Sequence, residues 1–160
     1  MISLSALRKA ALIWTIAMSG LAMTNSASAQ IDGSIDSAVV TATQWAAMAD
    51  AGQADRMWEQ SGQAMQKNIG KDGWLKYLGA VKKDLGAIGG RQWVQIVRIT
   101  NPPSLPPGEY INIAFSSRFS KGMAVEKISM IQTTGQWIPV GYVITKIEAG
   151  AAAPNPAKMR

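Results

Sequence analysis

The residues best suited to acid–base chemistry are two carboxylates and two tyrosines, Asp50, Glu126, Tyr110 and Tyr142. A carboxylate in an apolar pocket can act as a general base, and a tyrosine hydroxyl beside it can stabilise an oxyanion. These four residues are therefore the candidates for a catalytic site.

The same side chains also have structural interpretations. Asp50 precedes a turn and could cap the helix that follows it. Glu126 could pair with Arg118 or Arg98 across a sheet, and the tyrosines could pack with their hydroxyls in water. The sequence leaves both interpretations open, and the structural one is the simpler.

Histidine and cysteine are both absent from the 160 residues. Without histidine, imidazole base catalysis and the common zinc and copper sites are excluded. Without cysteine there is no disulfide, so the hydrophobic core alone must hold the fold. We expect no metal and no cofactor, and any catalysis would depend on Asp, Glu, Tyr, Lys, Ser or Thr.

Aromatic residues are the next candidates, because aromatic side chains often line pockets for apolar or carbohydrate ligands. They serve equally as core residues, and a domain without disulfides needs large buried side chains. The candidate ligand or partner surface comprises Trp45, Trp58, Trp93, Trp137 and Tyr142.

The chain is basic, with a formal net charge of +6. Several lysines near one predicted helix could form a face for anionic lipid or cell wall polymer, although a solvated helix surface explains them as well. The lysines concerned are Lys67, Lys71, Lys76, Lys82 and Lys83.

The N-terminus predicts export. Arg8 and Lys9 precede an apolar run over residues 10–23, and the small-residue pattern "NSASAQ" follows. This pattern is typical of a signal peptide, residues 1–29, that is cleaved after Ala29. The run is too short to span a membrane. We therefore expect a protein of the periplasm that does not span the membrane and does not bind nucleic acid.

Three helices are expected to follow. The first begins at Ser34 or Asp36 and ends at Gly52, and the second covers residues 54–68, weakened slightly by Gly62. The third has a basic side and an apolar side. Its apolar side comprises Trp74, Leu78, Val81 and Leu85.

The stretch "GAIGGR" should form a turn, and from Arg91 the apolar period changes to two. Residues 91–100 have apolar groups on both sides, which predicts a strand covered on both faces. A proline-rich loop follows. Residues 109–119 form a clearer strand, with a core face of Ile111, Ile113, Phe115 and Phe119.

A hairpin is expected over residues 126–148, with its turn at Gly135. Apolar residues on both faces of its second strand predict a place inside the sheet, or helices on one face and a partner or cavity on the other. Pro139 cannot donate a hydrogen bond, so we expect a bulge or an unpaired edge there.

The fold class is α+β, with three N-terminal helices and about four antiparallel strands. Residues 30–148 form one domain and residues 149–160 a disordered tail.

Four stretches together resemble the bacterial exported family catalogued as domain of unknown function 4019: "WAAMADAGQADRMWEQS", "PPGEYINIAFSSRF", "VEKISMI" and "GQWIPVGYVI". The resemblance implies a nuclear-transport-factor-2-like or cystatin-like domain, in which helices pack on a curved antiparallel sheet. Pro139 departs from the family's pattern in the last strand. The family implies no activity.

The leading hypothesis is a non-enzymatic exported domain. It would bind a small apolar ligand or a protein partner through the curved sheet, or form a homodimer through that surface. The first alternative is a small enzyme with an Asp or Glu base and a tyrosine donor in a cone-shaped pocket. The second is an envelope protein that binds anionic lipid or cell wall polymer.

Overall fold

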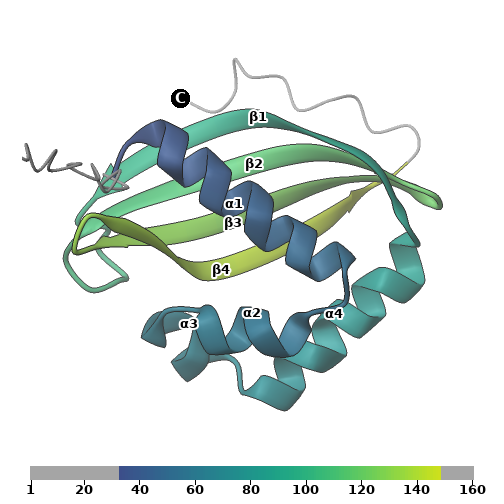
Figure 1. The fold of residues 1–160 in the computed structure, drawn as a ribbon, viewed down its shortest axis with the longest axis horizontal. Coiled ribbons are helices and arrows are strands. Elements are labelled where there is room, and N and C mark those ends of the chain that lie inside the picture. Colours follow the sequence, from purple (N-terminus) through teal and green to yellow (C-terminus); the bar gives the residue numbers. More distant parts are fainter. Residues whose placement is uncertain (1–32, 149–160) are drawn as a thin grey trace, which may run out of the picture.

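A computed structural model describes residues 33–148, which form four helices followed by four strands (Figure 1). The strands form one antiparallel sheet in the order β1-β2-β3-β4, and the helices lie on one side of it. The α+β class and the four-stranded antiparallel sheet are confirmed. The predicted signal peptide, residues 1–29, and the predicted tail, residues 149–160, lie outside the described residues.

Helix α1 (Ile35–Asp50) crosses the face of the sheet (Figure 1). Its N-cap is Ser34, whose hydroxyl oxygen accepts a hydrogen bond of 3.1 Å from the backbone N–H of Ser37. Beyond Asp50 the backbone turns at Gly52, which has a φ of 71°. The predicted bounds of this helix are therefore confirmed, and Ser34 rather than Asp36 is the cap. Its buried residues are Ala38, Ala42, Trp45 and Ala46.

The single helix predicted over residues 54–68 is wrong, because the chain breaks at Ser61 and Gly62 into α2 (Ala54–Gln60) and α3 (Gln63–Asn68). The N–H of Gly62 donates to the carbonyl of Pro139 at 2.8 Å. A Cβ on Gly62 would lie 2.8 Å from Cγ1 of Val140. Glycine therefore permits a close approach to the sheet, and this contact replaces the continuous helix.

Helix α4 (Lys71–Leu85) follows the predicted third helix. Trp74, Leu78 and Leu85 are buried and Val81 is partly buried, as the apolar spacing predicts. Together α2, α3 and α4 form a second helical group beside the β4 edge of the sheet (Figure 1). None of the helices in residues 33–148 is both long enough and apolar enough to cross a membrane.

Strand β1 (Ile88–Thr100) starts before Arg91, so the predicted turn is present only at Gly86, which ends α4 with a φ of 77°, while Gly89 and Gly90 extend the strand. The prediction that this strand is covered on both faces is also wrong. Trp93 is 53% exposed and Val94 55% exposed. The reason is that β1 is an edge strand, and a bulge between Trp93 and Gln95 displaces Val94 from the pairing.

The core face of β2 (Glu109–Phe119) is confirmed, because Ile111, Ile113, Phe115 and Phe119 are all buried. Strands β3 (Gly122–Thr133) and β4 (Gln136–Ile147) form the predicted hairpin. Its two turn residues, Thr134 and Gly135, have φ values of 48° and 80°, as a type I′ turn requires.

The bulge expected at Pro139 is present. Ser129 pairs with Gly141 and Met130 with Pro139, so Val140 has no partner on β3. Strand β4 forms the second edge of the sheet, which excludes a place inside it. Two of its groups are bonded to the helical side. The carbonyl of Pro139 accepts from Gly62, and the N–H of Ile144 donates to the hydroxyl of Tyr77 at 2.9 Å.

Candidate functional site

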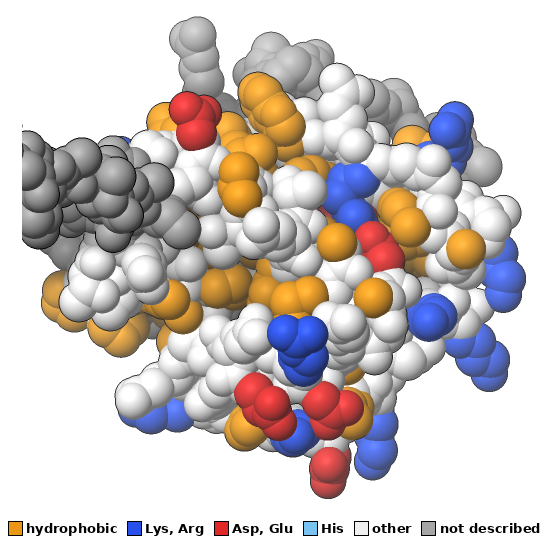
Figure 2. Space-filling model, in the orientation of Figure 1, with side chains coloured by type: hydrophobic (Ala, Val, Ile, Leu, Met, Phe, Trp, Pro, Cys, Tyr) orange, Lys and Arg blue, Asp and Glu red, His pale blue; other side chains and the backbone are white. Residues whose placement is uncertain are grey.

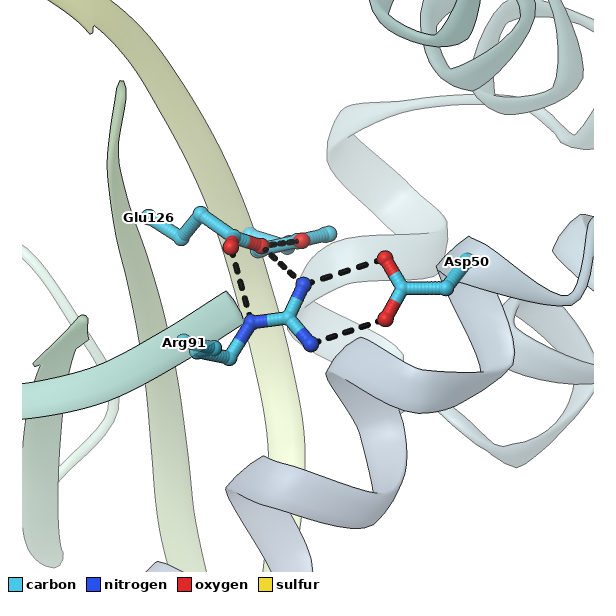
Figure 3. A network of polar contacts seen from close by, with 4 residues as sticks. Asp50, Arg91 and Glu126 are labelled. Carbon is cyan, nitrogen blue, oxygen red and sulfur yellow. Dashed lines mark hydrogen bonds and ion pairs between the residues drawn. The ribbon is translucent and has the colours of Figure 1, made fainter. Parts of the chain in front are cut away.

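An ion-pair network joins the end of α1 to the sheet (Figure 3). The guanidinium of Arg91 makes two bonds to Asp50, Nη1 to Oδ2 at 2.8 Å and Nη2 to Oδ1 at 3.1 Å. It makes two more to Glu126, Nε to Oε1 at 2.8 Å and Nη2 to Oε2 at 3.0 Å. The hydroxyl of Tyr142 donates to Oε2 of Glu126. The guanidinium of Arg91 thus donates two hydrogen bonds to each of the two carboxylates.

The fold explains why Asp50, Arg91 and Glu126 lie close together. Asp50 is the last residue of α1, the helix that crosses the face of the sheet (Figure 1). Arg91 lies opposite Ser117 on β2, and Glu126 lies on the adjacent strand β3, opposite Phe115. These positions face the helices, because alternate residues of a strand point to one side. The network therefore fixes α1 to three strands of the sheet.

Burial makes the network strongly electrostatic. The side chain of Glu126 is 0% exposed and that of Arg91 is 11% exposed, whereas Asp50 retains 22%. Burial alone would lower the pKa of Arg91, but the bonds and charges of Asp50 and Glu126 outweigh it and raise that pKa. Burial, followed by the charge of Glu126, raises the pKa of the Tyr142 hydroxyl well above its ordinary value.

This geometry suits a scaffold better than a general base. Both oxygens of each carboxylate accept from Arg91, so taking a proton from a substrate would break an ion pair. The Tyr142 proton is engaged by Glu126, and the raised pKa of Tyr142 disfavours its ionisation. The arrangement holds two anions with one cation and a neutral donor.

Three of the four predicted acid–base candidates meet here: Asp50, Glu126 and Tyr142. Tyr110 does not. It lies on the other face of the sheet, buried, with its hydroxyl donating to the carbonyl of Pro106 at 2.9 Å. The expectation that the tyrosine hydroxyls lie in water is therefore wrong for Tyr110 and for Tyr142.

The alternatives offered for the carboxylates are also wrong. Asp50 does not cap α2, since the N-cap there is Gln53, which makes no side-chain cap bond. Glu126 pairs instead with Arg91, which was not among the predicted site residues. Arg91 and Trp93 lie two residues apart and therefore share one face of β1. This alternation is the sequence signal that could have placed Arg91 on the core face. The bulge at Val94 interrupts it, so the face of β1 could not be counted along the strand.

An apolar groove lies between α3, α4 and the edge strand β4, and we call it the β4 groove. Its volume is about 290 Å³. Apolar and aromatic side chains dominate its wall, and no charged side chain lines it. The lining residues are Met65, Asn68, Ile69, Trp74, Tyr77, Val140, Gly141, Tyr142 and Val143.

A second pocket, of about 240 Å³, lies beside the ion-pair network. Asp50 and Tyr142 line it together with Lys82 and apolar residues of α4 and β1. The Asp50 carboxylate in this wall is the one already bonded to Arg91.

The five aromatic residues predicted as one ligand or partner surface do not gather on one surface. Trp45, Trp137 and Tyr142 are buried in the core, Trp58 is partly buried, and Trp93 is exposed on β1. Trp45 stacks on Trp74, with ring centroids 6.0 Å apart. The core interpretation therefore holds for most of them.

The lysine face is interrupted by acidic residues. Lys71 lies 2.8 Å from Glu59 and 3.2 Å from Asp55. Red and blue side chains alternate along the lower edge of the molecule (Figure 2). Within residues 33–148 no group of three acidic residues is arranged to hold a metal ion.

The molecule is thus a small α+β domain in which helices pack on one face of a four-stranded antiparallel meander. A buried Asp–Arg–Glu network joins the first helix to the sheet. The chain belongs to the family described as protein of unknown function (DUF4019), whose model matches residues 41–142. All four residues of the network lie within the matched range. Neither the curated proteins nor the solved structures gave a match. The nuclear-transport-factor-2-like or cystatin-like relationship therefore stays a prediction.

Proposed function

We propose that this protein is a non-enzymatic binding domain, exported to the periplasm, that holds a small uncharged apolar molecule in the β4 groove. The observation that carries the proposal is the lining of this groove. It is apolar and partly aromatic, and it lies beside the buried cluster of Trp74 and Tyr142.

The size of the groove supports a small molecule. Its volume of about 290 Å³ lies near the lower end of the range of ligand pockets, roughly 300–1,000 Å³. A protein helix would need a longer groove. A charged ligand would find no counter-charge among the lining residues, so a neutral apolar molecule fits best.

The rival enzyme function has less support. Asp50 and Tyr142 do line the pocket beside the network. However, Arg91 already occupies both carboxylates, and Tyr142 already donates to Glu126. The residues that would perform catalysis are instead those that hold α1 on the sheet.

A single charge in the groove tests the proposal. Val143 lines the groove and is 53% exposed, and it lies opposite Lys127 on β3, so Val143→Glu should fold. The neutral dye Nile red should bind the wild type with saturable fluorescence. Val143→Glu should weaken this binding by at least about 10-fold, because a carboxylate would have to lose its water next to the dye.

The matched control is Thr145→Glu, an exposed position on the same strand that does not line the groove. It should leave dye binding unchanged. Equal binding by the wild type and Val143→Glu, or no saturable binding at all, would remove the proposal.

A second copy of the chain, paired through β1, is a second candidate for what this domain binds. β1 is an open edge strand on which Trp93, Val94 and Val97 are exposed, and residues 92–97 carry no charge. Long uncharged edges readily pair with another strand. The opposite edge, on β4, is partly occupied, because Pro139 accepts from Gly62 and the N–H of Ile144 donates to Tyr77.

Val94→Lys should therefore shift the protein from dimer to monomer in sedimentation equilibrium, since a charged lysine on an edge opposes pairing. The control Thr145→Lys, on β4, should leave the molar mass of the protein in sedimentation equilibrium unchanged. A wild type that is monomeric at high micromolar concentration would refute this second candidate.

A further inference from the structure

The β4 groove meets strand β4 along its backbone. Gly141, Tyr142 and Val143 all line the groove. Tyr142 and Val143 are consecutive, so their side chains point to opposite faces of the sheet, and Gly141 has no side chain. Because residues that point to opposite faces line one groove, the groove runs along the edge of the strand. The main chain of β4 therefore forms part of the wall, beside the apolar side chains.

The main-chain N–H and C=O of Tyr142 face this groove. Opposite residues of an antiparallel pair alternate between pairs that bond to each other and pairs whose N–H and C=O point outward. The N–H of Ile144 donates to the hydroxyl of Tyr77, so the pair of Ile144 with Glu126 is of the outward type. Two positions away, the pair of Tyr142 with Ile128 is of the same type. Both groups of Tyr142 thus point away from β3, toward the helices beside this edge (Figure 1).

These two groups form a short open stretch between two bonded positions of the edge. On one side the carbonyl of Pro139 accepts from Gly62 at 2.8 Å, and on the other Ile144 donates to Tyr77 at 2.9 Å. Within residues 33–148, no backbone group of a helix or loop bonds to the main chain of Tyr142. A backbone donor and acceptor in an apolar wall need partners, so they select what the groove holds.

We propose that the ligand of the β4 groove is a neutral molecule that carries an amide beside an apolar group, such as one acylated and amidated apolar amino-acid residue. A carbonyl oxygen of the ligand accepts from the N–H of Tyr142, and an amide N–H of the ligand donates to the carbonyl of Tyr142. One residue of an added antiparallel strand makes the same two bonds. This inference rests on the proposed function of the groove and adds the chemical class of its ligand.

The flanking bonds limit the ligand to about one residue. A longer strand added to this edge would have to break the bond at Pro139 or the bond at Ile144. The groove volume of about 290 Å³ is also small. A single amide-bearing unit therefore fits better than a segment of a protein partner.

Amide hydrogen exchange tests this geometry. In the free protein the N–H of Val143 should be protected, because it points to β3 opposite Lys127, and the N–H of Tyr142 should exchange at least about 10-fold faster. Saturating N-acetyl-leucine N-methylamide should slow the exchange of Tyr142 and leave that of Val143 unchanged. Exchange of Tyr142 as slow as that of Val143 in the free protein, or unaffected by the ligand, would overturn the inference.

Displacement of Nile red separates this inference from the proposed function. N-acetyl-leucine N-methylamide should displace the dye, and its ester analogue, in which oxygen replaces the leucine N–H, should bind at least about 5-fold more weakly. The two ligands share their shape and apolar side chain, so the difference measures the bond donated to Tyr142. Equal affinities, or no displacement by the amide, would overturn the inference and leave the groove a site for the dye. Absence of saturable dye binding would instead refute the proposed function, and the inference with it.

Discussion

Arg91→Met is expected to lower the free energy of unfolding by about 3–5 kcal/mol, the largest effect of any single substitution considered for this protein. The reason is Glu126, which is fully buried and would lose both of its bonds to the guanidinium, so that a buried carboxyl group would be left without its partner. Urea unfolding followed by tryptophan fluorescence measures the change.

A rescue variant shows whether charge is the cause. In Arg91→Met combined with Glu126→Gln, the fully buried carboxylate is gone, Asp50 keeps its 22% exposure to water, and the glutamine can still accept from Tyr142. Most of the lost stability should return. Arg98→Ala is the control, because its pair with Glu109 is exposed and 3.5 Å long, and should cost less than about 1 kcal/mol. A double variant as unstable as the single one would contradict the electrostatic explanation.

Tyr142→Phe is expected to cost about 1.5–3 kcal/mol at neutral pH, because a hydrogen bond to the buried carboxylate of Glu126 is lost. It should also reduce the loss of stability at alkaline pH. Burial and the charge of Glu126 raise the pKa of Tyr142 in the folded protein, so the folded state keeps a proton that the unfolded chain releases near pH 10.

The sign follows from proton linkage. Above a pH of about 10 the unfolded state binds fewer protons than the folded state, so the stabilising contribution of Tyr142 is complete below that pH and declines above it. Urea midpoints between pH 8 and about 11 should therefore fall more steeply in the wild type than in Tyr142→Phe. Burial also raises the pKa of Tyr77, so a smaller decline should persist in the variant.

Tyr110→Phe is the control for this measurement, since the Tyr110 hydroxyl donates to the neutral carbonyl of Pro106. It should keep the steep alkaline decline of the wild type. Identical pH profiles for the wild type and Tyr142→Phe would show that the buried contact with Glu126 does not form.

Local patterns predicted the elements wherever one periodicity ran without interruption. The core face of β2, the hairpin turn at Gly135 and the bulge at Pro139 all follow from residue types that act within a few positions. The break between α2 and α3 does not, because it depends on Gly62 approaching Pro139 on a strand distant in sequence. Tertiary contact outweighed helix propensity there.

The site shows the same division. Asp50, Glu126 and Tyr142 stood out by their chemistry, but only the topology brings them together, and Arg91 completes the set from an edge strand with a bulge. The exposure of β1 could not be predicted from its sequence either, since apolar residues on both faces are also typical of a covered strand. Edge position is a property of the whole sheet.

The most direct test of the proposed function is native mass spectrometry of the protein purified after export by its own host, together with Val143→Glu and Thr145→Glu. The wild type and Thr145→Glu should carry the same excess mass over their denatured masses, corresponding to one small neutral molecule in the β4 groove. Val143→Glu should be free of it. A wild type without excess mass, or an excess that persists in Val143→Glu, would contradict the proposal that the β4 groove is the binding site.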